Sequence, residues 1–322
     1  MNRTYGNIGG ILLLAACMLA APQARAAGER TYDTREAAVA DLASAARKND
    51  AAGLRAILGP DAGSLIESGD AVEDAADRAA FAAAYAERNS LVPAEGRADR
   101  YFLDVGANGW RFPIPLVRES ASGRWRFDNK AGAEALLDRR IGHNELAAIQ
   151  VCLAYADAQW EYWRLNPDKT PVRHFAAALA SRPGKRDGLY WDATAEDERS
   201  PMGALVAAAE SGGYAAPSRE ERTGEKTPYY GYRYRVLTGQ GGHAAGGARD
   251  YRENGEMVNG FALLAYPETY GVSGVMTFMV NQEGVVYEKN LGRDTTAEAA
   301  KIAVFDPDSS WRAVEVTDTA RR

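Results

Sequence analysis

The stretch NELAAIQVCLAYADAQWEYW, from Asn144 to Trp163, carries the longest regular hydrophobic pattern of the chain. Its apolar residues recur at steps of three and four, the spacing that places side chains on one face of an α-helix. That face consists of Leu146, Ile149, Leu153, Ala156, Trp160 and Trp163, widened by Ala147, Val151 and Tyr155. Asn144 is a residue type that caps helix N-termini, so we predict an amphipathic helix over residues 144–163.

The residues before this helix, 30–141, predict a module in which helices are followed by a small antiparallel sheet. Helices are expected to begin at Asp33 and at Asp70 or Glu73, where acidic residues precede apolar ones. The period then changes to alternation around Asn108-Gly109, a strong hairpin signal. The strand after this turn contains two prolines, which predict an edge strand or a bulge because proline donates no hydrogen bond.

That order of elements resembles the ketosteroid-isomerase-like cone over residues 30–128. The resemblance implies a pocket between helices and sheet, where an acid in apolar surroundings can act as a base. Asp104 or Asp128, together with Tyr101, would be the nearest candidates for such a role. The alternation of the strand places Asp104 on the opposite face from Tyr101, however, and this favours a solvated acid.

The residues from 142 to 315 predict a second module, built from the long helix and a four-stranded antiparallel sheet. The strands are expected over Tyr229–Thr238, Gly260–Tyr266, Ser273–Val280 and Val285–Lys289. A sheet with one apolar face needs a cover, and the helix over residues 144–163 provides it, so that Leu153 and Trp160 are expected to be buried. This arrangement resembles the soluble part of a type IV pilin or pseudopilin. The expected fold class of the whole chain is α+β.

The N-terminus predicts export. Arg3 precedes an apolar, alanine-rich segment, and Ala24-Arg25-Ala26 has the small-x-small pattern of a cleavage site. Residues 1–26 are therefore predicted to be a signal peptide, which places the mature chain in the periplasm or outside the cell. The alternative is a lipid anchor, because Leu14-Ala15-Ala16-Cys17 resembles a lipobox that would be acylated at Cys17.

Charge and metal-binding residues exclude several classes of function. Cleavage after Ala26 removes two of the 38 basic residues and none of the 44 acidic ones, so the net charge of the mature chain becomes −8. An acidic chain without a basic cluster does not suit nucleic-acid binding. His143, His174 and His243 lack the spacing of metal ligands, so no metal and no other cofactor is expected. Cys152 lies beside the apolar face of the long helix and is expected to be a packed core residue.

Long segments of the chain resemble one family of bacterial exported proteins, the domain of unknown function 2950. The segments are YDTREAAVADL (32–42), GWRFPIPLV (109–117), RWRFDNKAG (124–132), RRIGHNELAAIQVCLAYADAQWEY (139–162), SRPGKRDGLYW (181–191), YYGYRYRVLTGQG (229–241), NGFALLAYPETYGVSGVMTFMVNQEGVVYEKNLG (259–292) and FDPDSSW (305–311). The resemblance spans nearly the whole mature chain. It implies no particular activity.

The sequence leaves three functional hypotheses open. The first is an exported, non-catalytic envelope protein that binds a partner or a small ligand, because no motif of a catalytic site is present. The second is an enzyme that uses a pocket in the cone-like module. The third is a glycan or cell-wall binder, in which Lys185 and Asp187 lie in a turn beside Tyr190 and Trp191. A cationic turn next to aromatic rings suits an anion or a sugar, but it also suits a surface turn that its rings pin to the core.

Overall fold

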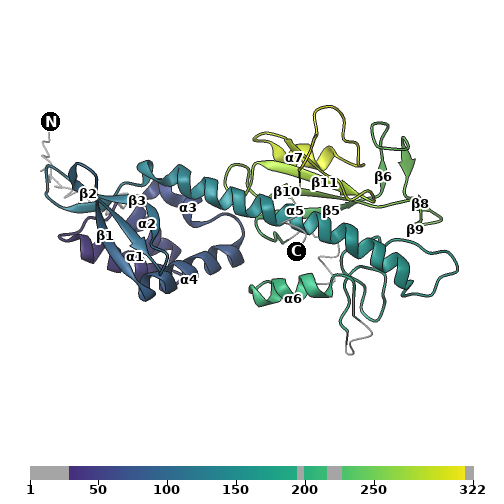
Figure 1. Ribbon diagram of the computed structural model, residues 1–322, viewed down its shortest axis with the longest axis horizontal. Helices are drawn as coiled ribbons and strands as arrows, with labels where there is room; N and C mark the ends of the chain where they lie inside the picture. The colour runs from purple at the N-terminus through teal and green to yellow at the C-terminus, as the bar shows by residue number, and fades with distance from the viewer. Residues whose placement is uncertain (1–28, 194–198, 216–226, 316–322) are drawn as a thin grey trace, which may run out of the picture.

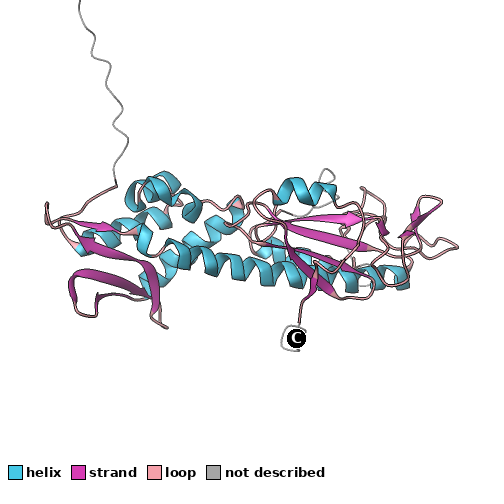
Figure 2. Cartoon of the chain, turned by 90° about the horizontal axis from the view of Figure 1, so that it is seen from above, coloured by secondary structure: helices cyan, strands magenta, loops and turns pink. Residues whose placement is uncertain are grey.

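The computed structural model describes residues 29–193, 199–215 and 227–315, so the predicted signal peptide and Cys17 lie outside the described residues. The molecule is elongated, and one helix, α5 (Ala133–Leu165), runs from its first half into its second (Figure 1). Figure 2 shows this helix running from the strands of the first half to those of the second half. Within the described residues no helix is long and apolar enough to cross a membrane. The α+β fold class is confirmed.

Four α-helices precede the first sheet. They are α1 (Arg35–Arg47), α2 (Ala51–Leu58), α3 (Gly63–Ile66) and α4 (Ala71–Glu87), with a 3₁₀ turn, η1 (Pro60–Ala62), before α3. The three longer helices begin at side-chain caps, which satisfy amide groups that have no partner inside the helix. Thr34 caps α1 through a 3.1 Å bond to Ala37 N, so the expected cap at Asp33 is wrong by one residue. Asp50 caps α2, and Asp70 caps α4 as predicted.

The first sheet is antiparallel and has four strands in chain order: β1 (Asn89–Ala94), β2 (Arg97–Val105), β3 (Trp110–Arg118) and β4 (Trp125–Phe127). β1 was not predicted. Of the two alternatives predicted for β3, the edge strand is wrong, since β3 lies between β2 and β4, whereas the bulge is confirmed by the register shift between β2 and β3. Its two prolines are tolerated because the short β4 pairs only with Leu116–Arg118, and because the register of β2 shifts between Tyr101 and Leu103.

The core of this half lies between the sheet and the helices α1 and α2. Its buried members include Val39, Leu42, Leu54, Ile57, Leu103, Ile114, Leu116 and Phe127. The helix α4 takes a smaller part in this core, and only Phe81, Ala84 and Tyr85 of it pack against the cluster, each of them partly buried. A 3₁₀ turn, η2 (Asn129–Ala131), leads from β4 into α5.

The helix α5 is one continuous element of 33 residues. We predicted a shorter helix that begins at Asn144, and this start is wrong. Asn144 lies inside α5 and is fully buried, with its amide donating to Glu73 Oε2 at 3.2 Å and to Ser273 O at 3.1 Å. Partners distant in sequence therefore hold Asn144 in the helix, where its own propensity would favour a terminus.

The buried face of α5 also differs from the predicted one. It consists of Ala148, Ile149, Val151, Cys152, Tyr155, Ala156, Ala158, Gln159 and Tyr162. Leu146 is 66% exposed and Trp160 is 40% exposed, so the expected burial of Trp160 is wrong, whereas Leu153 packs partly buried against the core. Gln159 explains why the buried face of α5 is turned relative to the predicted one. Its amide group donates to Ala176 O at 2.8 Å and accepts from Ala176 N at 2.9 Å. A hydrophobic pattern assigns such a polar residue to the surface.

The second sheet is antiparallel and has five strands, in the order β13-β12-β11-β10-β5. Their bounds are β5 (Tyr232–Leu237), β10 (Ala262–Pro267), β11 (Met276–Asn281), β12 (Val286–Asn290) and β13 (Arg312–Ala313). The four predicted strands are present, and the fifth, β13, was missed because it is two residues long. The helix α5 contacts β10, β11 and β12 and covers one face of this sheet.

Shorter elements complete the second half. They are α6 (Gly203–Ser211), α7 (Thr295–Lys301) and two small hairpins, β6 (Gly239–Gln240) with β7 (Arg249–Asp250) and β8 (Arg252–Glu253) with β9 (Glu256–Met257). Arg235 of β5 donates to Ile302 O at 2.7 Å, just after α7, while its neighbours Tyr232 and Tyr234 join the core under α5. The helices α5 and α7 thus lie on opposite faces of the sheet. The module boundary at residues 141 and 142 stays a prediction, because α5 crosses it without a break.

Candidate functional site

The four residues predicted to bind a ligand do not gather around one cavity. Lys185 is exposed in the turn, and Asp187 accepts from Arg182 N at 2.8 Å, so its carboxylate orders the turn. Trp191 is only 9% exposed, and the Arg186 guanidinium lies 5.6 Å from its ring centroid. Tyr190 donates to Asp192 Oδ1 at 2.9 Å. Tyr190 also lines a pocket, whose wall does not include Lys185, Asp187 or Trp191.

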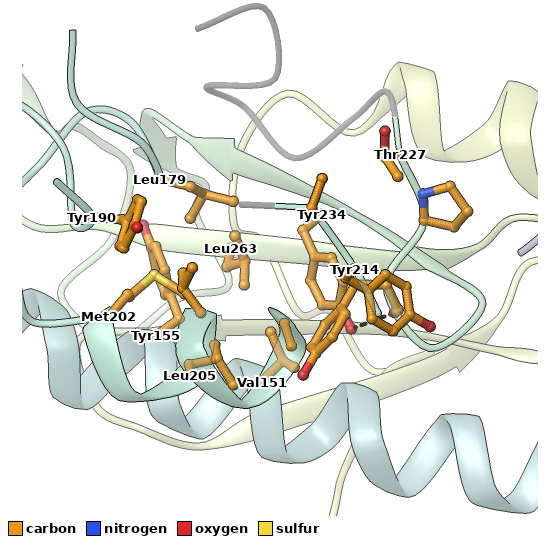
Figure 3. A pocket seen from close by; sticks show the side chains of 15 residues that line it. Val151, Tyr155, Leu179, Tyr190, Met202, Leu205, Tyr214, Thr227, Tyr234 and Leu263 are labelled. Carbon is orange, nitrogen blue, oxygen red and sulfur yellow. Dashed lines mark hydrogen bonds between the residues drawn. The ribbon is translucent and has the colours of Figure 1, made fainter. Parts of the chain in front are cut away.

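That pocket lies in the second half, beneath α6. Figure 3 shows Tyr155 and Tyr190 towards one end of it and Tyr214 towards the other, with Met202 and Leu205 along one side. Its volume is about 120 Å³, and its wall is almost entirely apolar. Sites for small organic ligands commonly occupy about 300–1,000 Å³, so this space is too small for most of them.

A larger pocket lies in the first half, between α4 and α5, and has a volume of about 470 Å³. Its apolar wall comes from five helices and the sheet: Leu42, Ala46, Leu54, Leu58, Leu65, Ala80, Phe81, Ala84, Val105, Trp110, Phe112 and Leu136. Charged residues border it as well, namely Glu73, Asp77 and Arg78 of α4 and Arg139, Arg140 and His143 of α5. An apolar cavity with a few polar groups is the usual form of a small-molecule site.

The sequence of α4 leaves this space open. Glu73, Asp77, Ala80 and Ala84 follow one another at steps of three and four, so they share the face that borders the pocket. The two alanines are too short to reach the opposite wall. Phe81 reaches it, with its ring centroid 5.4 Å from that of Phe112. Protein interiors are normally close-packed, so a helix that presents small residues to a cavity is an exception.

Glu73 is the most perturbed acid of this pocket. It is 7% exposed, and burial, followed by repulsion from Asp77 and Asp70, raises its pKa to about 7. The amide of Asn144 donates to its Oε2 and acts in the opposite direction. Burial also raises the pKa of Asp77, although this residue keeps contact with solvent on α4. Glu73 can therefore gain or lose a proton near neutral pH.

The arginines of the pocket hold neighbouring backbone. Arg140 donates to Ser64 O at 2.8 Å and to Leu65 O at 2.7 Å, and Arg78 donates to Ile66 O at 2.6 Å. These carbonyl groups end the short helix α3 and need donors from elsewhere. The guanidinium of Arg139 lies 5.3 Å from the ring centroid of Trp110. Two of the three arginines thus fix the wall of the pocket, while Arg139 lies at its edge.

The acids proposed for a cone-like active site lie elsewhere. Asp104 forms an ion pair of 2.8 Å with Arg111, and Asp128 lies 3.3 Å from Arg100. Neither borders the large pocket, whose acids are Glu73 and Asp77. The sequence contained a signal for these two, since they lie four residues apart on a face otherwise made of alanines. We considered Glu73 only as a possible start of this helix, and Asp77 was not singled out.

The comparisons with known proteins give a family and no activity. The family described as "Protein of unknown function (DUF2950)" matches residues 29–314. No curated protein and no solved structure matches the chain. The likenesses to the cone and to the pilins therefore stay predictions. In the described part of the chain, no group of three or more histidine, cysteine, aspartate or glutamate side chains is placed to hold a metal ion.

Proposed function

Because the chain belongs to the DUF2950 family, whose description assigns no activity, we propose a function from the pocket between α4 and α5. The protein is an exported, non-catalytic binding protein that holds a small, largely apolar molecule between α4 and α5. The observation that carries this proposal is the open pocket of about 470 Å³ in the first half.

The dimensions and chemistry of the pocket support this function. Its volume falls within the range of small-molecule sites, about 300–1,000 Å³. Apolar side chains from α1, α2, α4 and β3 would exclude water from the ligand, which is the main source of affinity for such molecules. The polar groups stand on two sides, Glu73 and Asp77 on α4 and Arg139 and His143 on α5. They would orient the polar end of a ligand and so select among apolar molecules.

A neutral fluorescent probe tests the proposal. N-phenyl-1-naphthylamine should bind the full mature chain, with a rise in fluorescence that saturates at one site. Ala84→Trp fills the pocket and should weaken binding at least tenfold. Ala83→Trp is the matched control, because Ala83 is exposed on α4 and does not border the pocket. Absence of probe binding, or equal binding by both variants, would overturn the proposal.

The location of the protein needs a separate test. The predicted leader at residues 1–26 supports export, and the lipobox-like segment supports an anchor at Cys17 as the alternative. The mature protein from an expressing bacterium should begin near Ala27 and should carry no lipid. Incorporation of labelled palmitate that disappears in Cys17→Ala would establish the anchor instead.

Proton transfer is the second candidate function, and one observation favours it. Glu73 has a pKa near 7 inside a pocket, and this is the property of many general acids and bases. Any turnover found in a substrate screen should be lost in Glu73→Gln and should show an inflection near pH 7. Turnover that persists in the variant would exclude Glu73 as the catalytic group.

A further inference from the structure

Buried polar groups join the two halves of the molecule at the first turn of α4. Asp70 is 1% exposed, and its Oδ1 caps the helix by accepting from Val72 N and Glu73 N, both at 3.2 Å. Its Oδ2 accepts from Tyr214 Oη at 2.8 Å and from Gly231 N at 3.0 Å, and both donors belong to the second half. One carboxylate thus positions the start of α4 and binds the second half.

A second link passes through α5. The buried amide of Asn144 donates to Glu73 Oε2 and to Ser273 O, at 3.2 and 3.1 Å. The next residue, Glu145, accepts through Oε1 from Val275 N at 3.0 Å and from Met276 N at 2.9 Å, where β11 begins. Glu73 also borders the large pocket. Glu73, Asn144 and Glu145 therefore connect the wall of that pocket to the start of β11.

The joint has little room for movement. Gly231 has a φ of +67°, and a Cβ on it would lie 2.6 Å from Asn144 Nδ2 and 2.8 Å from Ser273 Cβ. Gly69, just before the cap of α4, has a φ of +100°, and a Cβ there would lie 2.8 Å from Glu268 Cγ. Since close-packed contacts resist gradual deformation, a shift of the first turn of α4 must break these contacts or move the second half with it.

We propose that occupancy of the pocket between α4 and α5 is transmitted to the second half through the first turn of α4, by way of Asp70 and Glu73. This inference rests on the proposed binding function and adds a regulatory consequence to it. A ligand that displaces α4 from α5 changes the two bonds of Asp70 to the second half and the bond between Glu73 and Asn144. Tyr214 also lines the small pocket (Figure 3), so the change reaches that cavity. Coupling is reciprocal, so a weakened joint must alter affinity for the ligand.

Hydrogen exchange on the full mature chain tests the forward direction. Saturation with N-phenyl-1-naphthylamine should change the exchange rates of the Gly231 and Met276 amides by at least about fivefold. A fivefold change corresponds to the lower end of common coupling energies. The Val280 amide, near the opposite end of β11 from Met276, serves as the control and should not change. If the probe binds and the rates at Gly231 and Met276 stay the same, the inference fails while the binding function stands. If no probe binds, the binding function itself fails.

A pair of tyrosine variants tests the reverse direction. Tyr214→Phe removes the hydroxyl that donates to Asp70 and should change the dissociation constant of the probe at least about fivefold. Tyr190→Phe is the matched control, because it also removes a hydroxyl from the wall of the small pocket, but one that donates to Asp192. Equal affinities of both variants and the natural chain would overturn the inference.

Discussion

The helix α5 meets two different environments along its length. In the second half it buries Ala148, Cys152, Tyr155 and Tyr162 against a sheet, and the space left there is about 120 Å³. In the first half its residues border a cavity of about 470 Å³. The same helix thus completes one core and leaves the other open. Since unfilled space lowers stability, a cavity on this scale is expected where binding matters more than packing.

The largest effect expected from this difference concerns charge in α5. Cys152→Asp should cost about 4 kcal/mol or more, because the carboxylate would be buried without a partner under the second sheet. Leu136→Asp, at the wall of the open pocket, should cost about 1 kcal/mol, because the new side chain reaches solvent. Chemical denaturation followed by circular dichroism measures both. Equal losses would show that the two environments of α5 do not differ in the way described.

Two predictions from the sequence concern neighbouring residues of α5, Leu153 and Cys152. The sequence predicts that Leu153 is buried, but Leu153 is only partly buried, so Leu153→Asp should cost less than Cys152→Asp. The prediction that Cys152 is an unreactive core residue agrees with its surroundings. Complete burial raises the pKa of its thiol to about 12, so the reactive thiolate is scarce at neutral pH.

The next effect concerns pH. The pKa of Glu73 is raised from 4.5 to about 7, mainly by burial and by Asp77 and Asp70. Between these two values the folded state binds more protons than the unfolded state, so stability falls as pH rises from about 4.5 to about 7. Above pH 7 the ionised acid costs about 3 kcal/mol. Glu73→Gln should remove this cost and flatten the pH profile of unfolding, with a gain near zero below pH 4.5.

A surface acid provides the control for that profile. Asp104→Asn also removes a carboxylate from the first half, but its partner Arg111 is exposed and the pair lies outside the pocket. It should lose at most about 1 kcal/mol, as exposed ion pairs do, and should not stabilise the chain above pH 7. A gain from Asp104→Asn as large as that from Glu73→Gln would remove the special role of Glu73.

A smaller effect concerns the volume of core residues. Ala84→Leu extends into the large pocket and should stabilise the chain by about 1 kcal/mol. Ala148→Leu places the same side chain into a fully buried position of α5 and should destabilise it by about 2 kcal/mol. Thermal unfolding of the two variants gives the comparison. If Ala84→Leu also destabilised the chain, α4 would lie too close to the opposite wall for the pocket to be open there.

The sequence predicted the elements of this fold better than their environments. Four strands of the second sheet and the hairpin at Asn108-Gly109 carry local signals, namely alternation and turn residues, and all are present. The continuous helix α5 and the strand β13 depend on distant partners. Asn144 stays helical because Glu73 and Ser273 bind its amide, and no pattern within its own segment contains that information.

The candidate site was harder to predict for the same reason. A pocket is the absence of side chains between elements that are far apart in sequence, here Ala80 and Ala84 on α4 and Leu136 on α5. Alanines on an amphipathic helix ordinarily indicate close packing. The raised pKa of Glu73 needs both its burial and its neighbours in space, whereas the sequence shows only an acid near a helix start. The hypothesis of a cone-like pocket pointed to the half that contains the large pocket, but it named other acids.

The smallest expected effect concerns His243, a titrating group of the second half, in comparison with Glu73 of the first half. His243 lies exposed in a glycine-rich loop, where Asp306 accepts from its backbone N at 2.8 Å and lies 3.1 Å from its Nδ1. The hydrogen bond to this carboxylate, more than charge attraction, raises the pKa of His243. Its contribution to stability is therefore present below pH 6.5 and is lost as pH rises through the raised pKa. An NMR titration should show the His243 imidazole returning towards 6.5 in Asp306→Asn. Because the ring is exposed, His243→Gln should leave the pH profile of unfolding almost unchanged. A marked change would show that the pH dependence of stability originates in the second half and not in the first.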